Sequence, residues 1–259
     1  MIKNIYLPAI TAIVLSLFLS SCDLFTDQAI KQANQLIQQQ NIDKQDENWK
    51  TSLTQPPQFT FSEDKKYALK NLEFIGKWFI DDATKMNPNV NFGQSIPGKN
   101  DGRCFGIIEF GGLTGIIEFL ELAKDRKILG REIEEGMFNW FISYSNWLKN
   151  SKLGIEEATR KNNHATHYDG QLLNILLYLN KTEEVKKYLS TTTKARIFSQ
   201  IEPDGSQPLE LARTKSFSYS VMNLHGFLEL AVIGQKVGVN LWGMESEDGR
   251  SIKKGYQFM

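Results

Sequence analysis

The chain has 259 residues, and its 30 basic and 30 acidic side chains give a formal net charge of zero. A balanced charge provides no overall attraction for nucleic acid, so we expect no nucleic-acid partner, although a local basic patch would still bind an acidic polymer. The length allows one domain with a sizeable core after removal of a leader. There are two cysteines, Cys22 and Cys104.

The first residues have the pattern of an export signal. Lys3 precedes an apolar run over 7–19 that is too short for a stable transmembrane span. The run ends in Leu-Ser-Ser-Cys, which resembles the lipobox of bacterial lipoproteins, where the peptide is cut before a cysteine that then receives lipid. We therefore predict a signal peptide over 1–21 and lipidation at Cys22. The protein is then a lipid-anchored lipoprotein of the cell envelope, in the periplasm or at the outer membrane. The alternative is an ordinary signal peptide with a chance cysteine.

Residues 22–60 are rich in Gln, Asn and Asp and indicate a polar tether, with one short helix expected over 27–39. The folded domain is predicted over 61–259. A lipidated Cys22 leaves Cys104 without an intrachain disulfide partner. No metal-ligand pattern surrounds Cys104, so a buried, small apolar role is favoured over catalysis.

From about Tyr67 the apolar pattern is helical. The first stripe, Ala68, Leu72, Ile75 and Phe79, recurs at four-three-four spacing. Further helices are predicted over 107–123, 132–148, 166–179, 182–189, 192–199 and 216–237, and from Gly249 onward. Residues 89–105 carry many Asn, Gly and Pro and indicate an ordered loop. Because short polar connections separate the helices, we expect an all-α fold of antiparallel helix pairs.

Three polar stretches stand out against this helical background. The first comprises 82–89 and 94–103; the second is 161–169, which holds two of the three histidines beside two adjacent amides; the third runs from 200 to 224. Amides, an imidazole, a guanidinium and a phenol suit one kind of chemistry. They neutralise a carboxylate and move a proton at the carbon beside it.

Together these stretches resemble the alginate-lyase superfamily of polysaccharide lyases, which includes poly-mannuronate lyases and glucuronan-cleaving relatives. The resemblance covers roughly residues 65–258. It implies an (α/α) toroid with a cleft across one face, which we expect to be incomplete because family members extend further at both ends. It also implies an acidic polysaccharide as partner, and β-elimination without a metal or organic cofactor.

The resemblance also implies roles for individual residues. It places Asn163 and His164 at the substrate carboxylate, Arg213 near the same cleft, and Tyr219 where protons are exchanged with C5 and the departing O4. In mannuronate and glucuronate the C5 hydrogen and O4 lie on one face, so one tyrosine serves as base and acid. In guluronate they lie on opposite faces, and His164 is the more natural base.

Four further residues of the same stretches are expected to contact substrate: Arg103, Asn162, His167 and Gln207. His164 and His167, one helical turn apart, resemble a metal-binding pair. No further ligand stands at a suitable spacing, so we expect no metal.

Each site residue also has a structural interpretation. His164 is alternatively a hydrogen-bonded histidine at a helix end, and Asn162 a helix cap. Arg213 is alternatively paired with Glu210, and Tyr219 a core residue of an amphipathic helix.

The predicted function is thus a lyase that cleaves a uronate polymer, either alginate (mannuronan) or glucuronan. The alternatives are a glycan-binding envelope lipoprotein without turnover and a degenerate fragment of a lyase. Because an incomplete toroid leaves cleft walls and apolar faces of the 216–237 helix uncovered, we expect low activity, low stability and a tendency to associate.

Overall fold

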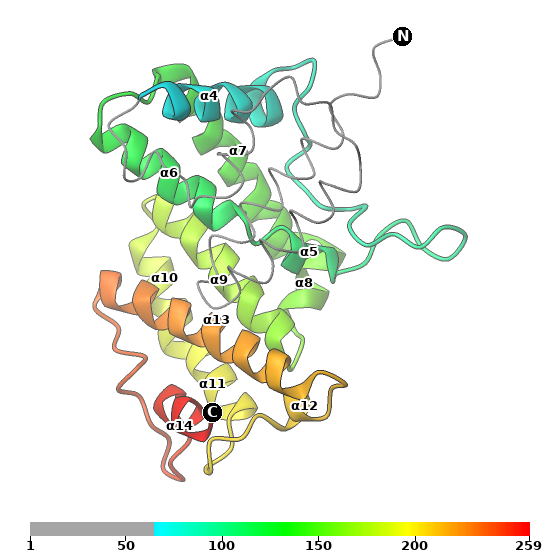
Figure 1. Cartoon of the computed structure of the whole chain (residues 1–259), viewed down its shortest axis with the longest axis vertical. Coiled ribbons are helices and arrows are strands. Elements are labelled where there is room, and N and C mark those ends of the chain that lie inside the picture. Colours follow the sequence, from blue (N-terminus) through cyan, green and yellow to red (C-terminus); the bar gives the residue numbers. More distant parts are fainter. Residues whose placement is uncertain (1–64) are drawn as a thin grey trace, which may run out of the picture. The chain divides into compact units, whose positions relative to one another are not determined.

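The computed structural model describes residues 65–259, and every regular element within them is a helix (Figure 1). The predicted signal peptide, Cys22 and the tether, with its helix over 27–39, lie outside the described residues. Within the described part, no helix combines the length and the apolar character needed to cross a bilayer.

The chain divides into two compact units. The described part of the first comprises 65–84 and 115–134. It contains α4 (Lys65–Ile75), its π-helical continuation η2 (Gly76–Ile80), most of α6 (Leu113–Asp125) and the start of α7 (Arg131–Asn150). The predicted apolar stripe of α4 and η2 is buried, as expected.

The second unit, 85–114 and 135–259, holds every residue predicted for the site. Besides the rest of α7 it contains the following helices: α5 (Gly106–Glu109), α8 (Lys152–Ala158), α9 (Asn163–Tyr178), α10 (Thr182–Tyr188), η3 (Leu189–Thr193), α11 (Lys194–Gln200), α12 (Pro208–Leu211), α13 (Ser216–Val237) and α14 (Ile252–Phe258).

Helix α9 is antiparallel to α7. Tyr168 donates to the Leu148 carbonyl over 3.0 Å, and Tyr144 donates to the Gln171 side chain over 2.6 Å. From Tyr168 to Gln171 the chain advances along α9, whereas the bonded residues of α7 go back from Leu148 to Tyr144. The two helices therefore run in opposite directions. Both tyrosines are buried, so these bonds satisfy hydroxyl groups that water does not reach.

Helix α9 is also antiparallel to the continuous rod formed by α10, η3 and α11. Thr166 donates to Gln200 near the end of the rod, whereas Asp169 accepts from Arg196 one turn earlier. Asp169 is fully buried and also accepts from Tyr188 and Thr193. Four donors on one carboxylate compensate the desolvation of its charge.

By contrast, α9 and α13 run parallel. Thr166 lies against Gly226, and one turn further along both helices Gly170 lies against Glu229. A Cβ at Gly226 would lie 2.9 Å from Thr166 Cγ2, so a larger residue would push the helices apart. In this unit each long helix is antiparallel to the next one and parallel to the one after that, which is the arrangement of an (α/α) fold.

A tight corner joins α7 to α8. The Ser151 hydroxyl caps α8 by accepting from the Gly154 amide over 2.9 Å. A Cβ at Gly154 would lie only 2.0 Å from the Leu148 carbonyl oxygen, so this corner requires glycine. The corner directs α8 back toward the start of α9, which it contacts.

Some predicted elements differ from the structure. The helix predicted over 107–123 is interrupted at 110–112, because Gly111 and Gly112 break it into α5 and α6. The helices predicted over 182–189 and 192–199 are joined by η3. Helices α8 and α12, of seven and four residues, were not predicted.

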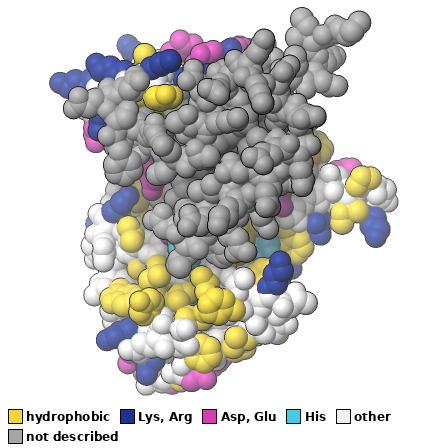
Figure 2. All heavy atoms as spheres, in the orientation of Figure 1, with side chains coloured by type: hydrophobic (Ala, Val, Ile, Leu, Met, Phe, Trp, Pro, Cys, Tyr) yellow, Lys and Arg dark blue, Asp and Glu magenta, His cyan; other side chains and the backbone are white. Residues whose placement is uncertain are grey.

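Helix α13 has the predicted bounds and carries exposed apolar side chains. Phe217, Met222 and Val232 are all exposed. Figure 2 shows hydrophobic side chains gathered over α13 on the face drawn. Other apolar residues of α13, among them Phe227, Leu230 and Ile233, are buried, so only part of the apolar surface of this helix is exposed.

Candidate functional site

An open pocket of about 740 Å³ lies within the second unit. Three segments line it: the loop before α5, the connection between α8 and α9, and the region from α12 to α13. The lining residues are Gln94, Phe105, Thr159, Arg160, Lys161, Asn162, His164, Leu209, Arg213 and Tyr219.

The pocket is cationic. Arg160, Lys161 and Arg213 line it, and none of the lining residues from the described part of the chain is acidic. The N-terminal end of α9 also opens onto it through Asn162 and His164, and the helix dipole favours negative charge there. The pocket therefore suits an anionic ligand with carboxylate groups, and the guanidinium groups offer paired donors for them.

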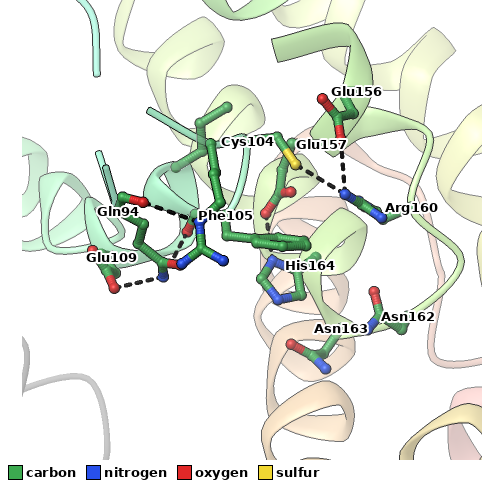
Figure 3. Close-up of polar contacts among 12 residues, drawn as sticks. Gln94, Cys104, Phe105, Glu109, Glu156, Glu157, Arg160, Asn162, Asn163 and His164 are labelled. Carbon is green, nitrogen blue, oxygen red and sulfur yellow. Dashed lines mark hydrogen bonds and ion pairs between the residues drawn. The ribbon is translucent and has the colours of Figure 1, made fainter. Parts of the chain in front are cut away.

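His164 lies in the first turn of α9 and lines the pocket (Figure 3). Its Nδ1 lies 2.6 Å from Oε1 of Glu157, a fully buried residue of α8. The Phe105 ring packs against the imidazole, with ring centroids 4.8 Å apart. His164 is thus both a hydrogen-bonded residue at a helix end and a pocket residue.

The two asparagines before His164 have different environments. Asn162 is the N-cap residue of α9, yet its side chain makes no capping bond and it lines the pocket. Asn163 is buried, and Glu210 accepts from both its backbone N–H (2.6 Å) and its Nδ2 (2.8 Å). Asn163 is not among the lining residues, and its Oδ1 is buried without a partner in the described part of the chain.

Arg213 and Tyr219 are in direct contact. The Arg213 Cζ lies 3.9 Å from the centroid of the Tyr219 ring, a cation–π arrangement. Both residues line the pocket. The carboxylate of Glu210, considered above as a partner for Arg213, instead binds Asn163.

Arg103 reaches the site through a neighbour. Its guanidinium donates to the Gln94 carbonyl over 3.0 Å and to the Gln94 side chain over 2.7 Å. Gln94 has a positive φ of 50° and lines the pocket, so Arg103 holds a strained loop residue in place. Arg103 itself is not among the lining residues.

The other two residues predicted to bind substrate lie outside the pocket lining. The Nε2 of His167 is buried without a partner in the described residues, and burial, reinforced by nearby His225, lowers the pKa of His167 to about 4. Gln207 is buried, donates to the Ser220 carbonyl and accepts from Asn223.

Several residues of the third polar stretch instead form a buried network beneath the site. Asn223 of α13 donates to both Gln200 and Gln207, and Gln200 also accepts from Thr166 of α9. This network joins α9, α11, α12 and α13. These amides are therefore occupied in fixing the helices that carry the pocket residues.

Sequence reasoning missed Glu157, Arg160, Lys161 and Phe105 as parts of the site. Glu157 belongs to a helix that was not predicted, so nothing distinguished it from its exposed neighbour Glu156. Arg160 binds Glu156 over 2.8 Å and lies over the Phe105 ring at 4.5 Å. The two consecutive basic residues just before Asn162, Arg160 and Lys161, were a signal in the sequence for a cationic site.

Cys104 is buried, as predicted, and its sulfur accepts from Arg160 over 3.2 Å. Burial raises the pKa of the Cys104 thiol to about 11, so it is protonated at neutral pH and a poor nucleophile. In residues 65–259 no group of three or more His, Cys, Asp or Glu side chains is placed to hold a metal ion.

The described residues thus form an all-helical fold with a pocket lined by three cationic side chains. The family model for alginate lyases matches residues 26–259, and the chain belongs to this family. The match begins inside the stretch predicted as a tether, whose boundaries remain a prediction.

A solved structure of an alginate lyase from Bacteroides ovatus is similar to this chain. The sequence identity is 38%, the TM-score is 0.75, and the match covers 81% of this chain and 55% of that one. The chain thus spans little more than half of the relative's length. No curated protein matches the chain. The predicted fold class, all-α of the (α/α)-toroid type, is confirmed.

Proposed function

We propose that this protein is a polysaccharide lyase that cleaves a uronate polymer, alginate (mannuronan) or glucuronan, by β-elimination. The observation that carries the proposal is the meeting of His164, Arg213 and Tyr219 in one pocket that is also lined by the cations Arg160 and Lys161. These residues come from two separate stretches of the sequence, 161–169 and 200–224, and supply the chemical groups that elimination beside a carboxylate needs.

In the proposed reaction, Arg213 and His164 donate to the carboxylate at C5. Removal of the C5 proton places negative charge on that carboxylate, and preorganised donors stabilise it as it forms. Tyr219 takes the C5 proton; the electron pair of the C–H bond forms the C4–C5 double bond, and the C4–O4 bond breaks. The departing O4 receives a proton from Tyr219.

The composition of the pocket argues against a glycosidase. Hydrolysis of a glycosidic bond usually needs two carboxyl groups that flank it. The acids bonded to residues of the site are already engaged, in four pairs: Glu157 with His164, Glu210 with Asn163, Glu109 with Gln94 and Glu156 with Arg160.

One observation favours the runner-up, a glycan-binding protein without turnover. Asn163, which the family resemblance assigns to the substrate carboxylate, is 1% exposed and bonded to Glu210. A site that lacks this donor would still bind polyuronate through its cations but would stabilise the transition state less.

The role of Tyr219 is tested by Tyr219→Phe, which removes only the hydroxyl group. We expect turnover of uronate polymers to fall by at least about 100-fold, because a positioned proton-transfer group contributes that much, whereas polymer affinity stays within about threefold. The matched control is Tyr256→Phe on α14, an exposed residue outside the pocket. Near-normal turnover by Tyr219→Phe would move proton transfer to another residue, with His164 the first candidate.

We also propose that the protein is anchored to a membrane of the cell envelope by lipid on Cys22. The support is the apolar run that ends at the lipobox-like Leu-Ser-Ser-Cys. Cys22→Ser should leave the precursor unprocessed or release the protein from membranes. Detergent partitioning and metabolic labelling with a fatty acid measure this; unchanged labelling of the variant would refute the anchor.

A further inference from the structure

Glu157 is a buried carboxylate with only one of its oxygens in use. Glu157 is 0% exposed. Its Oε1 lies 2.6 Å from Nδ1 of His164, whereas its Oε2 has no hydrogen-bond partner among the described residues. A buried charge without full hydrogen bonding is costly. The chain keeps this group outside the pocket lining, in contact with the histidine that lines the pocket.

Carboxylates with a purely structural task in this unit are bonded differently. Asp169 accepts four hydrogen bonds with its two oxygens, and Glu210 uses one oxygen for the backbone of Asn163 and the other for its side chain. Glu157 instead makes one short contact with a ring nitrogen of His164 and also lies near the Cys104 thiol, whose pKa is raised by burial and by this carboxylate. It is therefore a poor structural connector but well placed to orient an imidazole.

The geometry restricts His164 on two sides. An ionised carboxylate only accepts hydrogen bonds, so the contact requires the proton of the imidazole on Nδ1. The Phe105 ring packs against the imidazole at a tilt of 52° and limits its rotation. Nε2 is then the ring nitrogen left for a ligand in the pocket that His164 lines.

We propose that Glu157 is a positioning residue that fixes the orientation and tautomer of His164, so that Nε2 meets the substrate. The catalytic consequence rests on the proposed lyase function. When the ring is neutral and its proton is on Nδ1, Nε2 carries a lone pair that can accept a proton. When the ring is cationic, Nε2 carries a proton and donates a hydrogen bond to the uronate carboxylate. In the cationic state Glu157 compensates the positive charge on the ring from the buried side.

The primary test is the protonation of the imidazole, read from long-range ¹H–¹⁵N correlation spectra of the purified full-length chain near pH 7. The chain has only three histidines, and His164→Gln identifies the signal of interest. We expect a protonated Nδ1 in the wild type, and a shift of this nitrogen toward the unprotonated position in Glu157→Gln. A wild-type spectrum with unprotonated Nδ1, or an unchanged spectrum in the variant, would overturn the proposal.

The matched control is Glu229→Gln. Glu229 lies 3.6 Å from the Nδ1 of His225 on α13, outside the pocket. The same change of carboxylate to amide should alter the His225 signal and leave that of His164 in place. If Glu157→Gln does not fold, the wild-type spectrum still decides whether Nδ1 carries the proton.

The second test is kinetic. In Glu157→Gln, kcat should fall about a hundredfold while KM changes little, because a displaced catalytic group loses mainly transition-state stabilisation. Glu229→Gln should keep the wild-type kcat. A folded Glu157→Gln enzyme with wild-type kcat would overturn the proposal. Absence of turnover in the wild type would instead refute the lyase function, and the spectra would still decide the positioning.

Discussion

Three consecutive residues at the start of α9 have three different environments. Asn162 lines the pocket, Asn163 is buried and held by Glu210, and His164 lines the pocket with Glu157 behind it. A helix turns by about 100° per residue, so neighbours in sequence face different directions. A motif read as one functional unit is thus divided between substrate contact and support.

His167 yields a residue-scale prediction about stability. Burial lowers its pKa to about 4 from an ordinary value of 6.5. Between these two values the unfolded chain binds a proton that the folded chain does not, so the free energy of unfolding should fall as the pH is lowered from 6.5 to 4. The loss should be on the order of 3 kcal/mol, and it should be absent above pH 6.5.

Urea unfolding at several pH values between 4 and 7.5 measures this dependence. His167→Gln should flatten it, because the replacement does not titrate. Burial also lowers the pKa of the half-buried His225, so His225→Gln is the comparison and should flatten the curve less. Equal pH slopes for the wild type and His167→Gln would refute the assignment.

At the scale of elements, the sequence predicted α7, α10, α11 and α13 closely but missed α8 and α12. The 216–237 prediction coincides with α13, and 132–148 lies within α7. In such helices many apolar positions repeat with the helical period, so the pattern is strong. Helix α12, with four residues, contains too few positions to show a period, and α8 is no longer than the predicted α10, so its length alone does not explain why it was missed. Their formation depends on tertiary contacts, such as the close approach of Gly154 to Leu148.

The sequence likewise predicted only part of the candidate site. His164, Arg213, Tyr219 and Asn162 belong to motifs in the sequence, and the structure brings them into one pocket. Glu157 lies on an element that was not foreseen, and its relation to His164 appears only when α8 packs on α9. The burial of His167 and Gln207 likewise depends on how α9 and α13 pack.

For the whole molecule, membership of the alginate lyase family rests on a match across most of the chain. The similar Bacteroides ovatus enzyme is longer, and this chain spans 55% of it. The second unit nevertheless contains a polar network, a cationic pocket and the His164–Glu157 pair. These features are the basis of the lyase function proposed above.

The central claim, β-elimination on a uronate polymer, is tested most directly by the chemistry of the product. Purified protein is incubated with mannuronan, guluronan and glucuronan, and ultraviolet absorbance of the conjugated unsaturated ends is recorded beside the release of reducing ends. The account predicts that both signals rise together on at least one polymer and that Tyr219→Phe abolishes both. Reducing ends without the absorbance would show hydrolysis, and polymer binding without either signal would show a glycan-binding protein; each result would contradict the claim.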